Sequence, residues 1–60
     1  MKKVKELTSK SGVKMIIAID NMEGYAVFTK DEWIQGNGYR YAEYDGITNI
    51  EEAISQAINY

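Results

Sequence analysis

The last stretch of the chain, Thr48 to Tyr60, carries the clearest hydrophobic pattern. Its apolar side chains recur every three or four residues, as on one face of an α-helix, at Ile50, Ala53, Ile54, Ala57 and Ile58. Thr48 and Glu51 have the spacing of a capping box, which predicts that the helix begins at this threonine. A short helix is marginal by itself in water, so this amphipathic helix must pack against the strands predicted upstream.

Val13 to Ile19 is the strongest predicted strand, because large apolar side chains alternate along it. One face of this strand carries Val13, Met15, Ile17 and Ile19. The opposite face is apolar as well, since Ile16 and Ala18 lie there between two charged residues. A solvated sheet face normally carries polar side chains, so both faces of this strand need cover.

Weaker strands are predicted on either side of this central one. Lys2 to Thr8 contains only two sizeable apolar side chains, on opposite faces, and is expected to be a short or bulged edge strand. A turn over Ser9 to Gly12 leads from it into the central strand. Tyr25 to Phe28 is expected to pair antiparallel with the central strand, after a turn over Asp20 to Gly24 in which the glycine adopts a left-handed conformation.

The next segment has two interpretations. Thr29-Lys30-Asp31-Glu32 repeats the capping-box spacing, and Phe28 and Trp33 stand at the positions of a hydrophobic staple, which together favour a short helical turn ending at the following glycine. In the alternative, the strand continues to Gln35 and turns at Gly36-Asn37. We favour the helical turn because two local signals agree on it.

A further strand is predicted over Tyr39 to Tyr44 in either case, followed by a turn at Asp45-Gly46 into the final helix. Tyr39, Tyr41 and Glu43 would then lie on one face of that strand, opposite Arg40, Ala42 and Tyr44. The predicted fold is a single α+β domain over residues 1–60. It is a small antiparallel three- to four-stranded meander with one C-terminal amphipathic helix packed on one face, in the order β-β-β-short helical turn-β-α.

One helix covers only one face of this sheet, and the other face remains apolar around Ile16 and Ala18. One hypothesis is that a second copy of the chain or another partner covers this face. A second copy predicts a homo-oligomer, most simply a dimer. The other hypothesis is that Thr29 to Gln35 and the N-terminal strand fold over it.

The composition argues against catalysis. The chain contains neither cysteine nor histidine, so it has no disulfide, lacks the usual zinc ligands, and lacks the commonest general base and nucleophile. The adjacent acids at Asp31-Glu32 and Glu51-Glu52 are explained by the preference of first helical turns for negative charge. We therefore predict a protein that is not an enzyme and uses no metal or cofactor.

The chain also lacks membrane and export signals. No apolar run approaches the ~18 residues of a membrane span. Lys2 and Lys3 are not followed by the apolar core of a signal peptide, so the expected location is the cytoplasm.

Charge is distributed unevenly along the sequence. Residues 1–14 have five lysines and one glutamate, a balance of +4, whereas residues 15–60 have two cations and eight acids, a balance of −6. Lysines protect an exposed edge strand and acids solvate loops and helix starts, which is one explanation. The other is a bipolar surface that repels nucleic acid over most of its area and docks a basic partner protein.

Aromatic residues suggest where such a partner binds. Tyrosine is frequent, and Tyr39-Arg40-Tyr41 concentrates the residue types that carry binding energy at protein interfaces. The predicted partner-binding residues are these aromatic side chains and the charges near them, namely Trp33, Tyr39, Arg40, Tyr41, Asp31, Glu32, Glu43 and Asp45. The alternative is a small nucleic-acid-binding domain in which sheet aromatics stack on bases and the N-terminal lysines contact phosphates. The acidic balance of residues 15–60 opposes that alternative.

Gly46 to Ile54 resembles the strand-to-helix junction of HicB-type antitoxins and of the arm-binding domains of tyrosine integrases, both small sheets backed by a helix. The integrase type implies basic residues on the sheet, where this chain has only Arg40 beside Glu43, and the antitoxin type implies a proline that is absent here. No functional residue is carried over. A compact acidic protein of this size also resembles the small inhibitors and regulators of phages and mobile elements.

Overall fold

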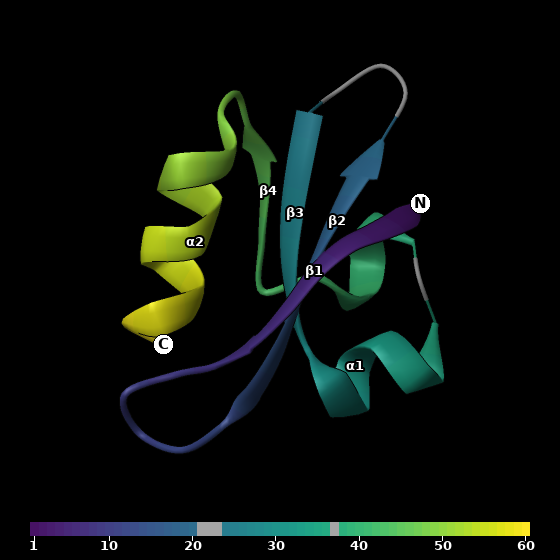
Figure 1. Ribbon diagram of the computed structural model, residues 1–60. Helices are drawn as coiled ribbons and strands as arrows, with labels where there is room; N and C mark the ends of the chain where they lie inside the picture. The colour runs from purple at the N-terminus through teal and green to yellow at the C-terminus, as the bar shows by residue number, and fades with distance from the viewer. Residues whose placement is uncertain (21–23, 37) are drawn as a thin grey trace.

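A four-stranded antiparallel sheet with helices on both faces forms the protein (Figure 1). The computed structural model describes residues 1–20, 24–36 and 38–60, and Tyr39 by its backbone only. The strands, in sheet order, are β1 (Lys2–Thr8), β2 (Lys14–Asp20), β3 (Gly24–Thr29) and β4 (Tyr44–Ile47). The helical segments are α1 (Lys30–Gln35), the 3-10 helix η1 (Tyr39–Tyr41) and α2 (Ile50–Ile58). The predicted α+β meander is confirmed.

The edge strand β1 is bulged, as predicted. It pairs antiparallel with β2, and the register shifts between Lys3 and Lys5, which leaves Val4 as the extra residue. The hairpin turn after β1 contains Gly12 at φ +87°, a conformation that favours glycine. The predicted turn after β2 includes residues 21–23, which lie outside the described residues. Gly24 at its end has φ +90°, as expected, and a Cβ there would lie 2.5 Å from the carbonyl oxygen of Ile47.

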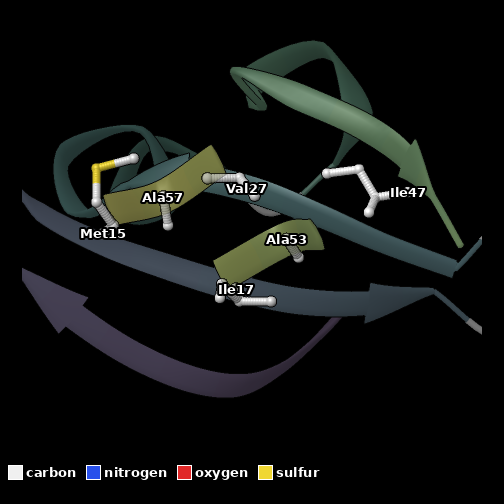
Figure 2. Close-up of a cluster of buried hydrophobic side chains, with 6 residues drawn as sticks. All are labelled: Met15, Ile17, Val27, Ile47, Ala53 and Ala57. Atoms are coloured by element: carbon white, nitrogen blue, oxygen red, sulfur yellow. The ribbon is translucent and has the colours of Figure 1, made fainter. Parts of the chain in front are cut away.

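The predicted apolar face of the C-terminal helix packs on one side of the sheet. Its two alanines are fully buried against β2, β3 and β4, in a cluster of Met15, Ile17, Val27, Ile47, Ala53 and Ala57 (Figure 2). The three isoleucines of the same face are half-buried around these alanines. Because alanine is the smallest apolar side chain at the contact, the helix lies close to the sheet.

Helix α2 begins and ends inside the predicted range. Asn49, not Thr48, is the N-cap, and its Oδ1 accepts a hydrogen bond from the Glu52 backbone N–H at 2.8 Å. The reason is that β4 extends to the buried Ile47, so the chain is still extended where the helix was expected to start. Threonine and asparagine are both good N-caps, so the end of β4 decides which of the two residues caps the helix. At the other end, the Lys10 N–H donates to the carbonyl of Ile58 at 2.8 Å.

The second face of the sheet is covered within the chain. Ile16, Ala18, Ala26 and Phe28 are buried there, and half-buried Met1, Trp33, Tyr41 and Ala42 pack over them. Figure 1 shows α1 and η1 on the side of the sheet opposite α2. The hypothesis of local cover is therefore confirmed for Thr29 to Gln35, with η1 and Met1 as further parts of the cover. It is wrong for the N-terminal strand, because β1 pairs with β2 at the edge of the sheet instead of folding over this face. This face no longer gives a reason for a dimer.

The short helix α1 forms as the local signals predict. Glu32 N–H donates to Thr29 Oγ1 at 3.2 Å, and Thr29 N–H donates to Glu32 Oε1 at 2.8 Å, so the capping box is complete. The rings of Phe28 and Trp33 meet edge to face with centroids 5.1 Å apart. Gly36 ends the helix in an extended conformation, and glycine is needed because a Cβ would overlap the ring of Tyr41. Asn37, part of the alternative hairpin turn, lies outside the described residues.

The predicted strand over Tyr39 to Tyr44 is wrong. Residues 39–41 form η1, and β4 begins only at Tyr44. The predicted turn at Asp45-Gly46 is wrong too, because these residues form a bulge inside β4, with Gly46 at φ +68°. The alternation of Tyr39 to Tyr44 favours a strand locally. Burial of Tyr41 and Ala42 over the second face outweighs that preference.

Candidate protein-binding surface

Four polar side chains meet where α1, β4 and the C-terminus come together. Glu32 comes from α1, Tyr44 begins β4, and Tyr60 follows α2. Glu43 is held by its backbone N–H, which donates to the carbonyl of Val27 at 2.8 Å. Glu43 is the centre of the group, since its carboxyl interacts with both Glu32 and the Tyr60 hydroxyl.

The Glu32 carboxyl perturbs that of Glu43. A hydrogen bond with the Glu32 carboxyl raises the pKa of Glu43 above its ordinary value, and partial desolvation and the charge of Glu32 act in the same direction. A hydrogen bond with Tyr60 partly opposes them. The negative charge of Glu43, followed by desolvation and the charge of Glu32, raises the pKa of the Tyr60 hydroxyl. The group therefore brings together two carboxyls whose charge attracts a cation when both are ionised.

The ion pairs of the described residues lie elsewhere. Within residues 1–20, 24–36 and 38–60 the ion pairs are Lys30 with Glu6 at 3.3 Å and Lys3 with Glu6 at 3.4 Å. Hydrogen bonds from Lys30 and then Lys3 lower the pKa of Glu6. In that described part of the chain no ion pair reaches Glu32 or Glu43.

The remaining predicted site residues separate into two groups. Trp33 and Tyr41 are half-buried in the cover of the second face, and Arg40 stacks over the Tyr41 ring at 5.4 Å from its centroid. Asp31 and Asp45 are exposed, and Asp45 lies on β4 beside the acidic group. The side chain of Tyr39 lies outside the described residues. The structure thus brings Glu32 and Glu43 together at one place, and Trp33, Arg40 and Tyr41 together at another.

Tyr44 and Tyr60 were not predicted as site residues. Tyr44 is 40% exposed and Tyr60 38% exposed, and both adjoin the acids. For Tyr60 the sequence offers one signal of exposure, because this residue follows the helix and is not part of its apolar face. Tyr44 had no such signal, because its position depends on where β4 begins. We define the acidic-tyrosine surface as Glu32, Glu43, Tyr44, Asp45 and Tyr60.

Other polar features have structural explanations. Ser9 is buried, and its Oγ accepts the Val13 N–H at 3.0 Å and lies 2.9 Å from Ser11 Oγ, so it stabilises the first hairpin.

A partly open hollow of about 230 Å³ is lined by Val13, Lys14, Thr29, Lys30 and Asp31. Over the described ranges, no group of three or more acids is placed to hold a metal ion. None of the helices described is long and apolar enough to cross a membrane.

Comparison with known proteins adds no relative. No family model, no curated protein and no solved structure matches this chain. What the fold itself defines is a small α+β domain with one acidic and tyrosine-bearing surface.

Proposed function

We propose that the protein is a non-catalytic protein-protein interaction module, of the kind that acts as a small acidic inhibitor or regulator by occupying a basic surface of a partner protein. The observation that carries the proposal is the meeting of the Glu32 and Glu43 carboxyls next to two exposed tyrosines, with no cation of the described chain in an ion pair there. A partner's lysine or arginine would offset the repulsion between the two carboxylates on binding.

The two kinds of side chain have different roles in this proposal. Carboxylates guide a basic surface to the site and set its orientation. Tyrosines supply large contact area with little conformational entropy to lose, and they can stack against a bound cation. Tyr44 and Tyr60 are therefore proposed as anchors, with Glu43 and Asp45 as the charge-matching groups.

The nucleic-acid alternative receives less support. Of the sheet aromatics expected to stack on bases, Tyr41 packs over the second face of the sheet, and Arg40 stacks on its ring. Of the N-terminal lysines, Lys3 is already paired with Glu6. The acidic surface would in addition repel a phosphate backbone.

The test is calorimetric titration with a lysine- and arginine-rich peptide. We expect the double variant E43Q/D45N to bind at least about tenfold more weakly than the wild type, a change of ~1.4 kcal/mol. The matched control E51Q/E52Q removes the same charge from the exposed first turn of α2 and should keep wild-type affinity. Equal weakening in both variants would show unspecific attraction to total charge and would contradict the proposed surface.

A second titration separates the two classes of function. Labelled single- and double-stranded oligonucleotides are added at ~150 mM salt, where the Debye length is about 8 Å and weak surface attraction is screened. We expect no specific binding, by anisotropy or by fluorescence of Trp33. Submicromolar, sequence-dependent binding would replace the proposal by the nucleic-acid alternative.

A further inference from the structure

We propose that the basic surface recognised by the acidic-tyrosine surface is the β1 edge of a second copy of this chain, so that copies join edge to edge into one continuous antiparallel sheet. This inference rests on the proposed function, because it names the partner of that same surface. It is carried by the charge complementarity between the two edges of the sheet.

The β1 edge is basic and open. Figure 2 shows β1 and β4 as the two outermost strands, in agreement with the sheet order. Nearly all of β1 is exposed, and it carries three lysines and one glutamate. That glutamate, Glu6, is already shared by Lys3 and Lys30. Lys2 and Lys5 take part in neither of these two ion pairs, which are the ones found in the described ranges, and are available to another molecule.

The β4 edge is acidic and open. Tyr44, Asp45 and Gly46 are exposed, and only Ile47 of this strand is buried. Glu43 immediately precedes the strand and Glu32 lies beside it. An edge strand presents unpaired backbone N–H and C=O groups on its outer side, which a further strand can use.

The charges select one of the three possible edge pairings. Pairing β1 with β1 brings lysines together, and pairing β4 with β4 brings acids together, so both are opposed. Pairing β4 with β1 of the next copy brings opposite charges together. The sheet alternates strand direction from β1 to β4, so a second copy in the same orientation places its β1 antiparallel to β4.

The register follows from the rows of the sheet. Lys5, Ile17, Val27 and Tyr44 form one row across the four strands. Continuing this row places Lys5 of the next copy beside Tyr44 on the same face of the sheet, with Glu43 and Asp45 at the adjacent chain positions. A lysine next to an exposed tyrosine is a favourable pair.

The resulting interface is heterologous, because β4 of one copy pairs with β1 of the next copy. Such interfaces form rings when the rotation closes and open filaments when it does not. The ladder is short, since β4 has four residues and both edges are bulged. Association is therefore expected to be weak, to increase with protein concentration and to weaken as salt rises.

Charge reversal tests the interface by sedimentation velocity of the full chain at low salt over a range of protein concentrations. We expect the wild type to associate, and both E43K/D45K and K2E/K5E to be monomeric. Mixing the two variants should restore association, because the basic β1 of the first again meets the acidic β4 of the second. The control E51K/E52K changes net charge as much as E43K/D45K and should associate like the wild type. Thermal unfolding of each variant confirms that it is folded.

The remaining outcomes distinguish this inference from the proposed function. Unchanged association of K2E/K5E would overturn the inference, because the contact would not use β1. A wild type that stays monomeric yet binds the basic peptide through Glu43 and Asp45 would also overturn the inference and leave the proposed function standing. A wild type that neither associates nor binds the peptide would overturn both.

Discussion

The two faces of the sheet are buried in different ways. On one face a regular helix, α2, places two alanines over Met15 and Val27. On the other, Trp33 of the short helix α1, Tyr41 of the 3-10 helix η1, Ala42 and Met1 together cover Ile16 and Phe28. The regular cover is visible as a periodic pattern in the sequence, whereas the irregular cover is not. The comparison teaches that a thin domain can bury a second apolar face with short segments and without a second long helix or a partner.

The first prediction concerns the largest side chain under the irregular cover. Phe28→Ala should destabilise the protein by about 3–5 kcal/mol, because Phe28 is fully buried and its loss leaves a cavity under Trp33. A domain of this size has little more stability than that. The midpoint of urea unfolding measures the effect. A loss below about 1 kcal/mol would mean that the second face is not packed as described.

The regular cover is tested by a pair of isoleucines. Ile54→Ala should cost about 2 kcal/mol, at the low end for this substitution, because Ile54 is half-buried against the first core. Ile34, which is 71% exposed on α1, is the matched control, and Ile34→Ala should change stability by no more than about 0.5 kcal/mol. Equal denaturant midpoints for the two variants would show that the assigned face of α2 is wrong.

The helices α2 and α1 each begin at an N-cap residue. Asn49→Ala should cost about 1 kcal/mol because it removes the acceptor for the Glu52 N–H. Thr48→Ala should have a smaller effect, since Thr48 is not the cap. In α1, Thr29→Ala should cost a similar amount to Asn49→Ala. Thermal unfolding compares the three variants, and a larger loss for Thr48→Ala than for Asn49→Ala would favour the capping box expected from the sequence.

The smallest expected effect on stability comes from the charges of Glu32 and Glu43. Glu32 of α1 raises the pKa of Glu43, so the folded state binds a proton more readily than the unfolded state. The pair therefore favours folding below the ordinary carboxyl pKa, and this contribution is lost as pH rises through the raised pKa of Glu43. Glu43→Gln should be slightly more stable than the wild type at neutral pH.

The pH dependence separates this effect from others. The gain of Glu43→Gln should disappear once the pH falls below the ordinary pKa of a glutamate, where the wild-type carboxyl is protonated as well. Glu51→Gln, at the exposed start of α2, should show no such gain. Thermal unfolding from acidic to neutral pH measures both. A gain that persists at acidic pH would mean that repulsion with Glu32 is not its cause.

Much of the fold follows from local patterns in the sequence. The helical face of Ile50 to Ile58, the two-sided strand over Val13 to Ile19 and the capping box at Thr29 are each specified by neighbours three or four residues apart, or by simple alternation. These signals are local, so the sequence alone determined these three elements and the meander that short connections impose.

The tertiary structure decided where η1 and β4 begin and which residues meet. Residues 39–41 became a 3-10 helix because the second face needed cover, and β4 moved to Tyr44–Ile47 because Ile47 completes the first core. The acidic-tyrosine surface depends on that shift, since it joins side chains from α1, β4 and the C-terminus. Burial of apolar area acts between distant segments and outweighs local preferences of about 1 kcal/mol, which is why no local pattern contained this surface.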